Sequence, residues 1–248
     1  RFAKHREVSV SPSTIAAHFR LLSLIYGYAM TQGVQDWSPL GAVKIKAGRP
    51  KRTYFLSEDS VYDLVDRIEA ESGSAHARTD AALVGFLYLT GLRRSEVNRI
   101  ELSDIDLAQG KIWIDGKRRD EFIGISESCA EFVETLVAAS RNYVPDGRAR
   151  GIAKRGGKFL MWNISYITKA FDRIKKFDGQ LHPHALRHSY CTEIVKAMKT
   201  AGKSDQEILQ ITRIKSLQTL AIYVHLTADR SDVNLIGRGR RRKLRRVE

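Results

Sequence analysis

The sequence predicts a mainly α-helical fold with one small antiparallel β-sheet, an α+β architecture. Most segments place apolar residues at helical spacing, and residues 80–91 form a nearly all-apolar helix. Only residues 111–126 alternate apolar and polar side chains in the manner of paired strands. At 248 residues the chain is long enough for one large domain or for a small domain joined to a larger one.

The first predicted helix covers residues 11–33. Ser11 or Ser13 is the expected N-cap, Pro12 lies in the first turn, and Gly33 follows the end. The next segment, "SPLGAVKIKAGRPKR", carries proline, glycine and basic residues without periodicity, which indicates a linker. We therefore expect three parts: a helical piece with the start of the linker at 1–46, a main domain at 53–228 and a basic tail at 229–248.

The main domain opens with a helix capped by Ser57, followed by the apolar helix that ends at Gly91. A hairpin comes next, with a polar turn around Gly116. Further helices are predicted at about 127–140, 163–176, 184–200, 204–213 and 217–224.

Charge is the first indication of function. Forty-two basic residues against 28 acidic ones leave a net charge of +14, which favours a polyanionic partner such as nucleic acid. The stretch 238–246 alone has seven basic residues in nine. No apolar run is long enough to cross a membrane, and two cysteines suit a reducing compartment. We therefore expect a cytoplasmic, DNA-associated protein.

The stretch "HPHALRHSYC" places His184, Arg187, His188 and Cys191 on one helical face. A zinc site is disfavoured, because the arginine would repel a cation and neither an HExxH glutamate nor a CxxC pair is present. Ordinary packing explains His188 and Cys191, but a buried Arg187 needs an anion or carboxylate partner. A phosphate site uses both the arginine and a neighbouring imidazole.

Other segments supply further side chains that suit a phosphate site. "TGLRRSEVNRI" places Arg93 at the Gly91 turn with Glu96 as its possible partner, and Lys117 lies at the hairpin tip. Tyr223 lies in "TLAIYVHL" near the C-terminus.

These motifs together resemble the tyrosine recombinase (phage integrase) family, over roughly Ser11–Thr227. The resemblance is carried by TGLRxSE, a G-K hairpin, HxLRH and a late I-Y-x-H, in the family's order and with 24 residues between Arg93 and Lys117. Residues 11–33 are also similar to the last helices of the family's DNA-clamping domain, whose first part is expected to precede this chain. The implied fold is a recombinase catalytic domain preceded by a partial helical core-binding domain.

The resemblance implies a site-specific recombinase or integrase, typical of mobile elements, that works without metal, ATP or another cofactor. Arg93 and Arg187 would bind the scissile phosphate, and Lys117 would protonate the departing 5′ oxygen. His184 would assist proton transfer near the tyrosine, and Tyr223 would attack to form a 3′-phosphotyrosine. Glu96 would orient Arg93, and His188 would be structural.

One position departs from the family pattern. Nine residues before the nucleophile, where the family usually has histidine or tryptophan, this chain has Ile214. Lys215 or Arg213 could reach the phosphate instead, the helix could begin one residue out of register, or activity could be reduced. A lost donor costs about 2 to 4 kcal/mol when nothing replaces it.

The implied partner is double-stranded DNA with a specific core site. Two protomers would bind a site and four would assemble at synapsis, with Arg118, Arg119 and Arg213 as further DNA contacts. Two alternatives stay open: relaxation of DNA in the manner of a type IB topoisomerase, and a catalytically weakened DNA-binding relative, which Ile214 alone supports.

Overall fold

The computed structural model describes residues 11–43, 45, 53–71, 73–116, 119–141 and 164–227. The chain divides into two compact units, Arg1–Arg52 and Thr53–Glu248. In the first unit, helix α2 (Pro12–Thr31) begins at Ser11, whose hydroxyl accepts a hydrogen bond from the Thr14 amide. Of the two predicted N-cap residues, Ser11 is therefore the cap.

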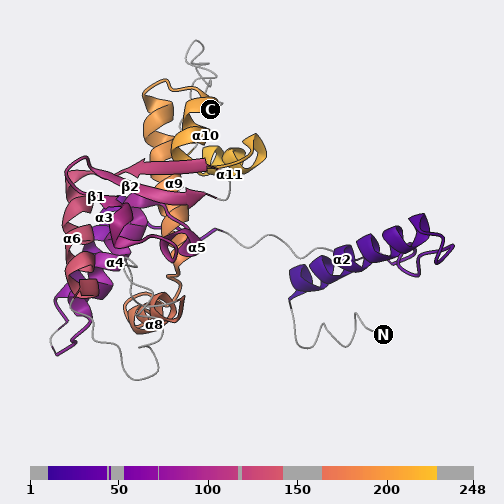
Figure 1. Cartoon of the computed structure of the whole chain (residues 1–248), viewed down its shortest axis with the longest axis horizontal. Coiled ribbons are helices and arrows are strands. Elements are labelled where there is room, and N and C mark those ends of the chain that lie inside the picture. Colours follow the sequence, from indigo (N-terminus) through magenta and orange to yellow (C-terminus); the bar gives the residue numbers. More distant parts are fainter. Residues whose placement is uncertain are drawn as a thin grey trace, which may run out of the picture. The chain divides into compact units, whose positions relative to one another are not determined.

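The second unit is built around a buried helix, α4 (Ala77–Thr90), which is contacted by α3 (Glu58–Glu69), α6 (Glu127–Arg141), α8 (Ile164–Ile174) and α9 (Pro183–Thr200) (Figure 1). Ser57 caps α3 as predicted, and the apolar residues of that helix lie on one buried face: Val61, Leu64, Val65 and Ile68. Phe86 and Leu87 of α4 are fully enclosed, which explains why this helix has no polar face.

The sheet has three antiparallel strands in the order β1-β2-β3. The predicted hairpin is β2 (Lys111–Gly116) and β3 (Arg119–Gly124), with Trp113 opposite Phe122. Strand β1 (Ile105–Asp106) and the preceding 3₁₀ turn η1 (Leu102–Asp104) were not predicted, because a two-residue strand shows no alternation. The α+β fold class predicted from the sequence is confirmed.

The C-terminal part of the described chain packs as a small helical layer. Helices α10 (Asp205–Thr212) and α11 (Leu217–Thr227) contact each other and α9 (Figure 1). A separate apolar cluster lies beneath them, formed by Cys191, Val195, Ile208, Ile214, Leu220 and Tyr223. None of the helices in the described part of the chain has the length and apolarity that crossing a bilayer requires.

Candidate active site

A glycine turn begins the site. Helix α4 ends at Thr90, and Gly91 adopts the left-handed conformation, with φ 57°. A β-carbon at Gly91 would overlap the Tyr190 ring of α9, so glycine is required both for the turn and for the close approach of the two helices. The turn carries Arg93 to the start of the short helix α5 (Arg94–Val97).

Glu96 holds two arginines at this turn. Its Oε1 accepts from Arg93 Nη1 at 2.7 Å, and its Oε2 accepts from the Arg93 backbone amide at 2.7 Å. Arg213 Nη2 donates to the same Oε2 at 3.2 Å. Burial opposes the carboxylate charge, but Arg213 and the Arg93 donors outweigh it and hold the pKa of Glu96 below its ordinary value. The pair of arginines is therefore anchored by one ionised carboxylate.

Arg187 is buried, with 3% of its surface exposed. Its Nη1 donates to the Gly91 carbonyl and its Nη2 donates to the Thr212 carbonyl at 3.1 Å. The expected carboxylate partner is absent from the described contacts of Arg187. Both carbonyls instead lie at helix ends, where the last backbone oxygens have no partner within the helix. Arg187 links the end of α4 to the end of α10.

Three histidines lie along the first turns of α9. His182 caps the helix, and its Nδ1 accepts from the Ala185 amide at 3.1 Å. His184 is exposed, and its ring meets that of His188 edge-on, with centroids 4.4 Å apart. The part of the ring that is removed from water, followed by the charge of Arg187, lowers the pKa of His184. This favours a neutral imidazole in the free protein.

Tyr223 lies on α11, with 4% of its surface exposed. Its hydroxyl is 2.8 Å from His188 Nδ1, and the Cys191 thiol is within hydrogen-bonding reach of Tyr223 as well. Burial is the main reason that the pKa of Tyr223 is raised, and burial together with His184 lowers the pKa of His188 to about 4. The phenol and imidazole are therefore both neutral at pH 7.

A hollow of about 390 Å³ opens beside these groups, lined by Leu92–Ser95 and by His182–His184. Its charged or titratable groups are basic: Arg93, Arg94, His182 and His184. Arg94 and His182 were not singled out in the sequence, although each lies within two residues of a predicted site residue. The lining is suited to a phosphate or another anion.

The hairpin tip lies outside the described residues. Lys117 and Arg118 both fall there, and Arg119 is described only as the first residue of β3. Lys215 is exposed in the turn between α10 and α11. No three His, Cys, Asp or Glu side chains within the described ranges are placed to share a metal ion.

Ile214 is buried, with 7% of its surface exposed, in the same apolar cluster as Tyr223. The preceding residue, Arg213, adopts the left-handed conformation, with φ 53°, immediately after α10 ends. This turn directs the Arg213 guanidinium to Glu96. Arg213 is therefore part of the arginine cluster, whereas Ile214 belongs to the apolar packing beneath it.

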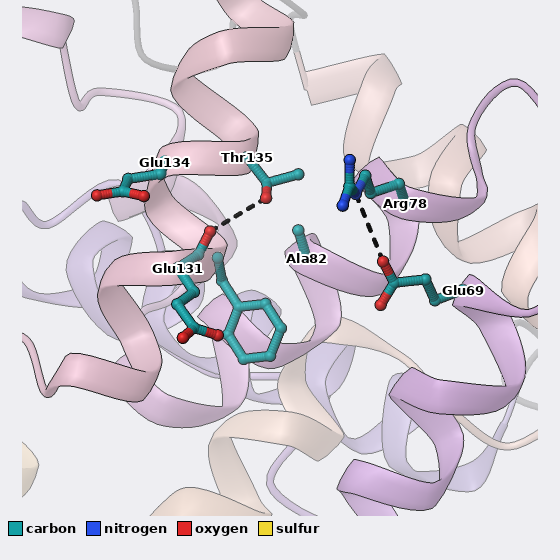
Figure 2. Close-up of a pocket in the computed structure, with 7 residues that line it drawn as sticks. Glu69, Arg78, Ala82, Glu131, Glu134 and Thr135 are labelled. Carbon is teal, nitrogen blue, oxygen red and sulfur yellow. Dashed lines mark hydrogen bonds and ion pairs between the residues drawn. The ribbon is translucent and has the colours of Figure 1, made fainter.

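A second hollow, of about 280 Å³, lies between α3, α4 and α6 (Figure 2). Three carboxylates line it, those of Glu69, Glu131 and Glu134, together with Arg78. Arg78 Nε pairs with Glu69 Oε1 at 3.4 Å, as Figure 2 shows. Its charge is opposite to that of the first hollow, which makes it unsuitable for an anion.

Comparison with known proteins gives consistent matches. Residues 54–230 match the model described as the phage integrase family. A tyrosine recombinase XerC from Lactobacillus delbrueckii subsp. bulgaricus is 24% identical over 223 residues, covering 88% of this chain and 74% of the relative. The tyrosine recombinase XerC of Pelotomaculum thermopropionicum is 26% identical over 239 residues, covering 92% of this chain and 75% of the relative.

Solved structures show the same fold. The Tn1549 transposon integrase in complex with circular intermediate DNA has a TM-score of 0.67 at 16% identity, covering 90% of this chain and 78% of that one. A lambda integrase dimer bound to a COC′ core site has a TM-score of 0.61 at 16% identity, covering 100% of this chain and 81% of that one. At these identities the likeness shows the fold alone.

Proposed function

Since the chain belongs to the phage integrase family, we propose that Tyr223 cuts a DNA strand by forming a covalent bond to the 3′ phosphate. The match to the family and the XerC relatives identify the chain as a site-specific tyrosine recombinase, as its motifs predicted. The identity of the nucleophile, the identity of the general acid and the assembly of protomers on DNA are our proposal.

The observation that carries this proposal is the convergence of basic groups from three segments around one turn. Arg93 immediately precedes α5, His184 and Arg187 come from α9, and Arg213 follows α10. Glu96 and the Gly91 carbonyl connect them. Because a transferring phosphoryl group carries negative charge on its nonbridging oxygens, cations fixed in advance lower the barrier.

In the proposed reaction, Arg93 and Arg187 hydrogen-bond the scissile phosphate, and His184 donates to it from the rim of the hollow. Lys117 protonates the 5′ oxygen as it leaves, because an alkoxide is a poor leaving group. The phosphotyrosine conserves the bond energy, so ligation of another strand requires no ATP. We assign no metal or organic cofactor to these steps.

Arg213 is our proposed substitute for the donor that is missing at Ile214. The support is its contact with Glu96, which places its guanidinium beside Arg93. Lys215 is less suited, because its side chain is exposed and has no such anchor among the described contacts. Of the three explanations for Ile214, replacement by Arg213 best fits the positions of the side chains.

We propose double-stranded DNA with a specific core site as the partner, in a cytoplasmic, nucleoid-associated setting. The solved relatives include a lambda integrase dimer on a core site and XerH bound to a palindromic difH substrate. By analogy, two protomers would occupy a site and four would form the synapse. The hairpin residues Arg118 and Arg119 and the basic segment 238–246 are proposed to contact the DNA backbone.

The first test selects a bound sequence from a pool of duplexes with a randomised centre and converts it to a nicked suicide substrate. Incubation with chelator and denaturing gel analysis should give a covalent protein–DNA band that Tyr223→Phe abolishes. A plasmid that lacks the selected site tests the topoisomerase alternative, since relaxation of it would contradict a site-specific reaction. Binding without a covalent band would favour the catalytically weakened relative.

A further inference from the structure

The hydrogen bond between Tyr223 and His188 connects the proposed nucleophile to an imidazole. The phenol oxygen lies 2.8 Å from His188 Nδ1, and the two rings have centroids 5.6 Å apart. His184, one helical turn earlier on α9, contacts the His188 ring edge-on and lines the basic hollow. The three rings therefore form a contiguous series from the hollow to the nucleophile.

Burial, and then the basic groups around it, keep the His188 imidazole neutral. His184 and Arg187 lie on the same helix, and His182 caps it, so three groups that are or can become cationic oppose a further positive charge. On the other side, α11 contributes the Tyr223 phenol, and α9 contributes the buried Cys191 thiol beside it. A neutral imidazole that accepts at Nδ1 has its proton on Nε2.

A purely structural role would also account for one hydrogen bond, because buried polar groups need partners. The placement of the pair argues for more than this. The phenol oxygen is the atom that must lose a proton for the proposed attack, and His188 Nδ1 is the ring nitrogen hydrogen-bonded to it, which accepts when the imidazole carries its proton on Nε2. His184 has no such bond to Tyr223 among the described contacts; it faces the hollow instead.

We propose that His188, rather than His184, is the catalytic residue that accepts the proton of Tyr223 during attack on the phosphate. The phenol O–H bond breaks and its proton moves to His188 Nδ1, while the phenol oxygen forms a bond to phosphorus. The bond from phosphorus to the 5′ oxygen breaks, and that oxygen takes a proton from the Lys117 ammonium, the proposed general acid. No oxidant, reductant or further reactant is needed.

Binding of DNA makes this transfer favourable. In the free protein burial keeps the proton on the phenol, because the pKa of Tyr223 is raised and that of His188 is lowered. A phosphate monoanion bound in the hollow places a negative charge among these arginines and histidines. It stabilises an imidazolium at His188, while bond formation to phosphorus makes the phenol more acidic. His184 is then free to hydrogen-bond the phosphate.

The inference rests on the proposed function, so its test uses the suicide duplex selected above. We expect His188→Gln to reduce the rate of covalent cleavage by about 10² or more, with DNA binding unchanged. His76→Gln is the matched control, because His76 lies at the opposite end of α4 and makes no side-chain cap. Circular dichroism and thermal unfolding of each variant check that the fold is retained.

Two chemical changes distinguish a defect in deprotonating Tyr223 from a defect in protonating the 5′ oxygen that leaves. Replacing the bridging 5′ oxygen by sulfur gives a leaving group that needs no protonation, so it should restore cleavage by Lys117→Ala but not by His188→Gln. Incorporating 3-fluorotyrosine at position 223 makes the phenol more acidic and should recover part of the activity of His188→Gln. Rescue of His188→Gln by sulfur, or no effect of fluorination, would overturn the assignment.

The outcomes for the unmodified protein distinguish the two proposals. If the wild type gives no Tyr223-dependent band, the proposed function fails and the role of His188 fails with it. If the wild type cleaves and folded His188→Gln cleaves at the same rate or faster, only the His188 proposal is wrong. Nitrogen NMR of the free protein provides an independent check, since a proton on His188 Nδ1 rather than Nε2 would contradict an acceptor role.

Discussion

The two ends of helix α4 carry hollows of opposite charge. At its C-terminal end, the Gly91 turn places Arg93 and Arg94 opposite His182 and His184. Nearer its N-terminal end, Arg78 and the carboxylates of Glu69, Glu131 and Glu134 line the second hollow (Figure 2). The same buried helix thus carries one hollow suited to an anion and one with an excess of carboxylates. Of these two, only the first lies at a left-handed glycine turn with an ionised carboxylate anchoring its arginines, and His184 connects it to the ring of His188, the partner of the proposed nucleophile.

The largest effect is expected at Arg187. Arg187→Met keeps much of the side-chain volume but leaves the Gly91 and Thr212 carbonyls without their buried donor. We expect the free energy of unfolding to fall by about 2 to 5 kcal/mol and cleavage to disappear. Denaturant titration and the covalent-band assay measure the two effects. A variant of wild-type stability would contradict the linking role of Arg187.

Matched glycine substitutions compare the turn at the C-terminal end of α4 with the interior of the same helix. A β-carbon at Gly91 overlaps the Tyr190 ring and also meets a left-handed backbone, whereas one at Gly85 overlaps only the Phe132 ring. We expect Gly85→Ala to cost about 1 to 3 kcal/mol from overpacking, and Gly91→Ala about 1 to 2 kcal/mol more. Thermal and denaturant unfolding test the order, and equal costs would show that the turn relaxes without strain.

Arg213 and Lys215 differ in anchoring, although both are basic and flank Ile214. Arg213→Gln removes one of the two arginines on Glu96, so cleavage should fall about 10- to 100-fold. Lys215→Gln changes an exposed side chain and should alter cleavage less than about threefold. Single-turnover rates on the suicide substrate measure both. The reverse order would make Lys215 the substitute donor.

The histidines of α9 should make the protein sensitive to mild acid. Burial and then His184 lower the pKa of His188 to about 4, whereas an unfolded histidine titrates near 6.5. Between these values the unfolded chain binds more protons, so stability falls as the pH drops through this window. After allowance for partial exposure, the loss is about 1 to 2 kcal/mol. His188→Gln should flatten the slope in denaturant titrations across that range.

The smallest effect is expected at the acidic hollow. Arg78 and Glu69 are largely exposed, so Arg78→Gln should change stability by less than about 0.5 kcal/mol. Covalent cleavage should be unchanged, because this hollow does not take part in the proposed chemistry. A marked loss of cleavage without loss of stability would give the second hollow a function.

The motifs and the helices were predictable because each depends on neighbouring residues. Ser11 and Ser57 cap their helices as expected, and the apolar helix ends at Gly91. The order of TGLRxSE, HxLRH and I-Y-x-H was sufficient to indicate the family that the comparisons confirm. The roles of the site residues, including those of Lys117 and Arg118 outside the described ranges, stay predictions.

The contacts of the site depended on packing between distant segments. Arg187 was expected to meet an acid, but the ends of α4 and α10 bring two carbonyls to it. The partner of Arg213 is 117 residues away, and that of Tyr223 is 35 residues away. Local sequence determines which residues are chemically able to act. Which atom each one touches follows from burial, because polar groups removed from water must bond to whatever the fold places beside them.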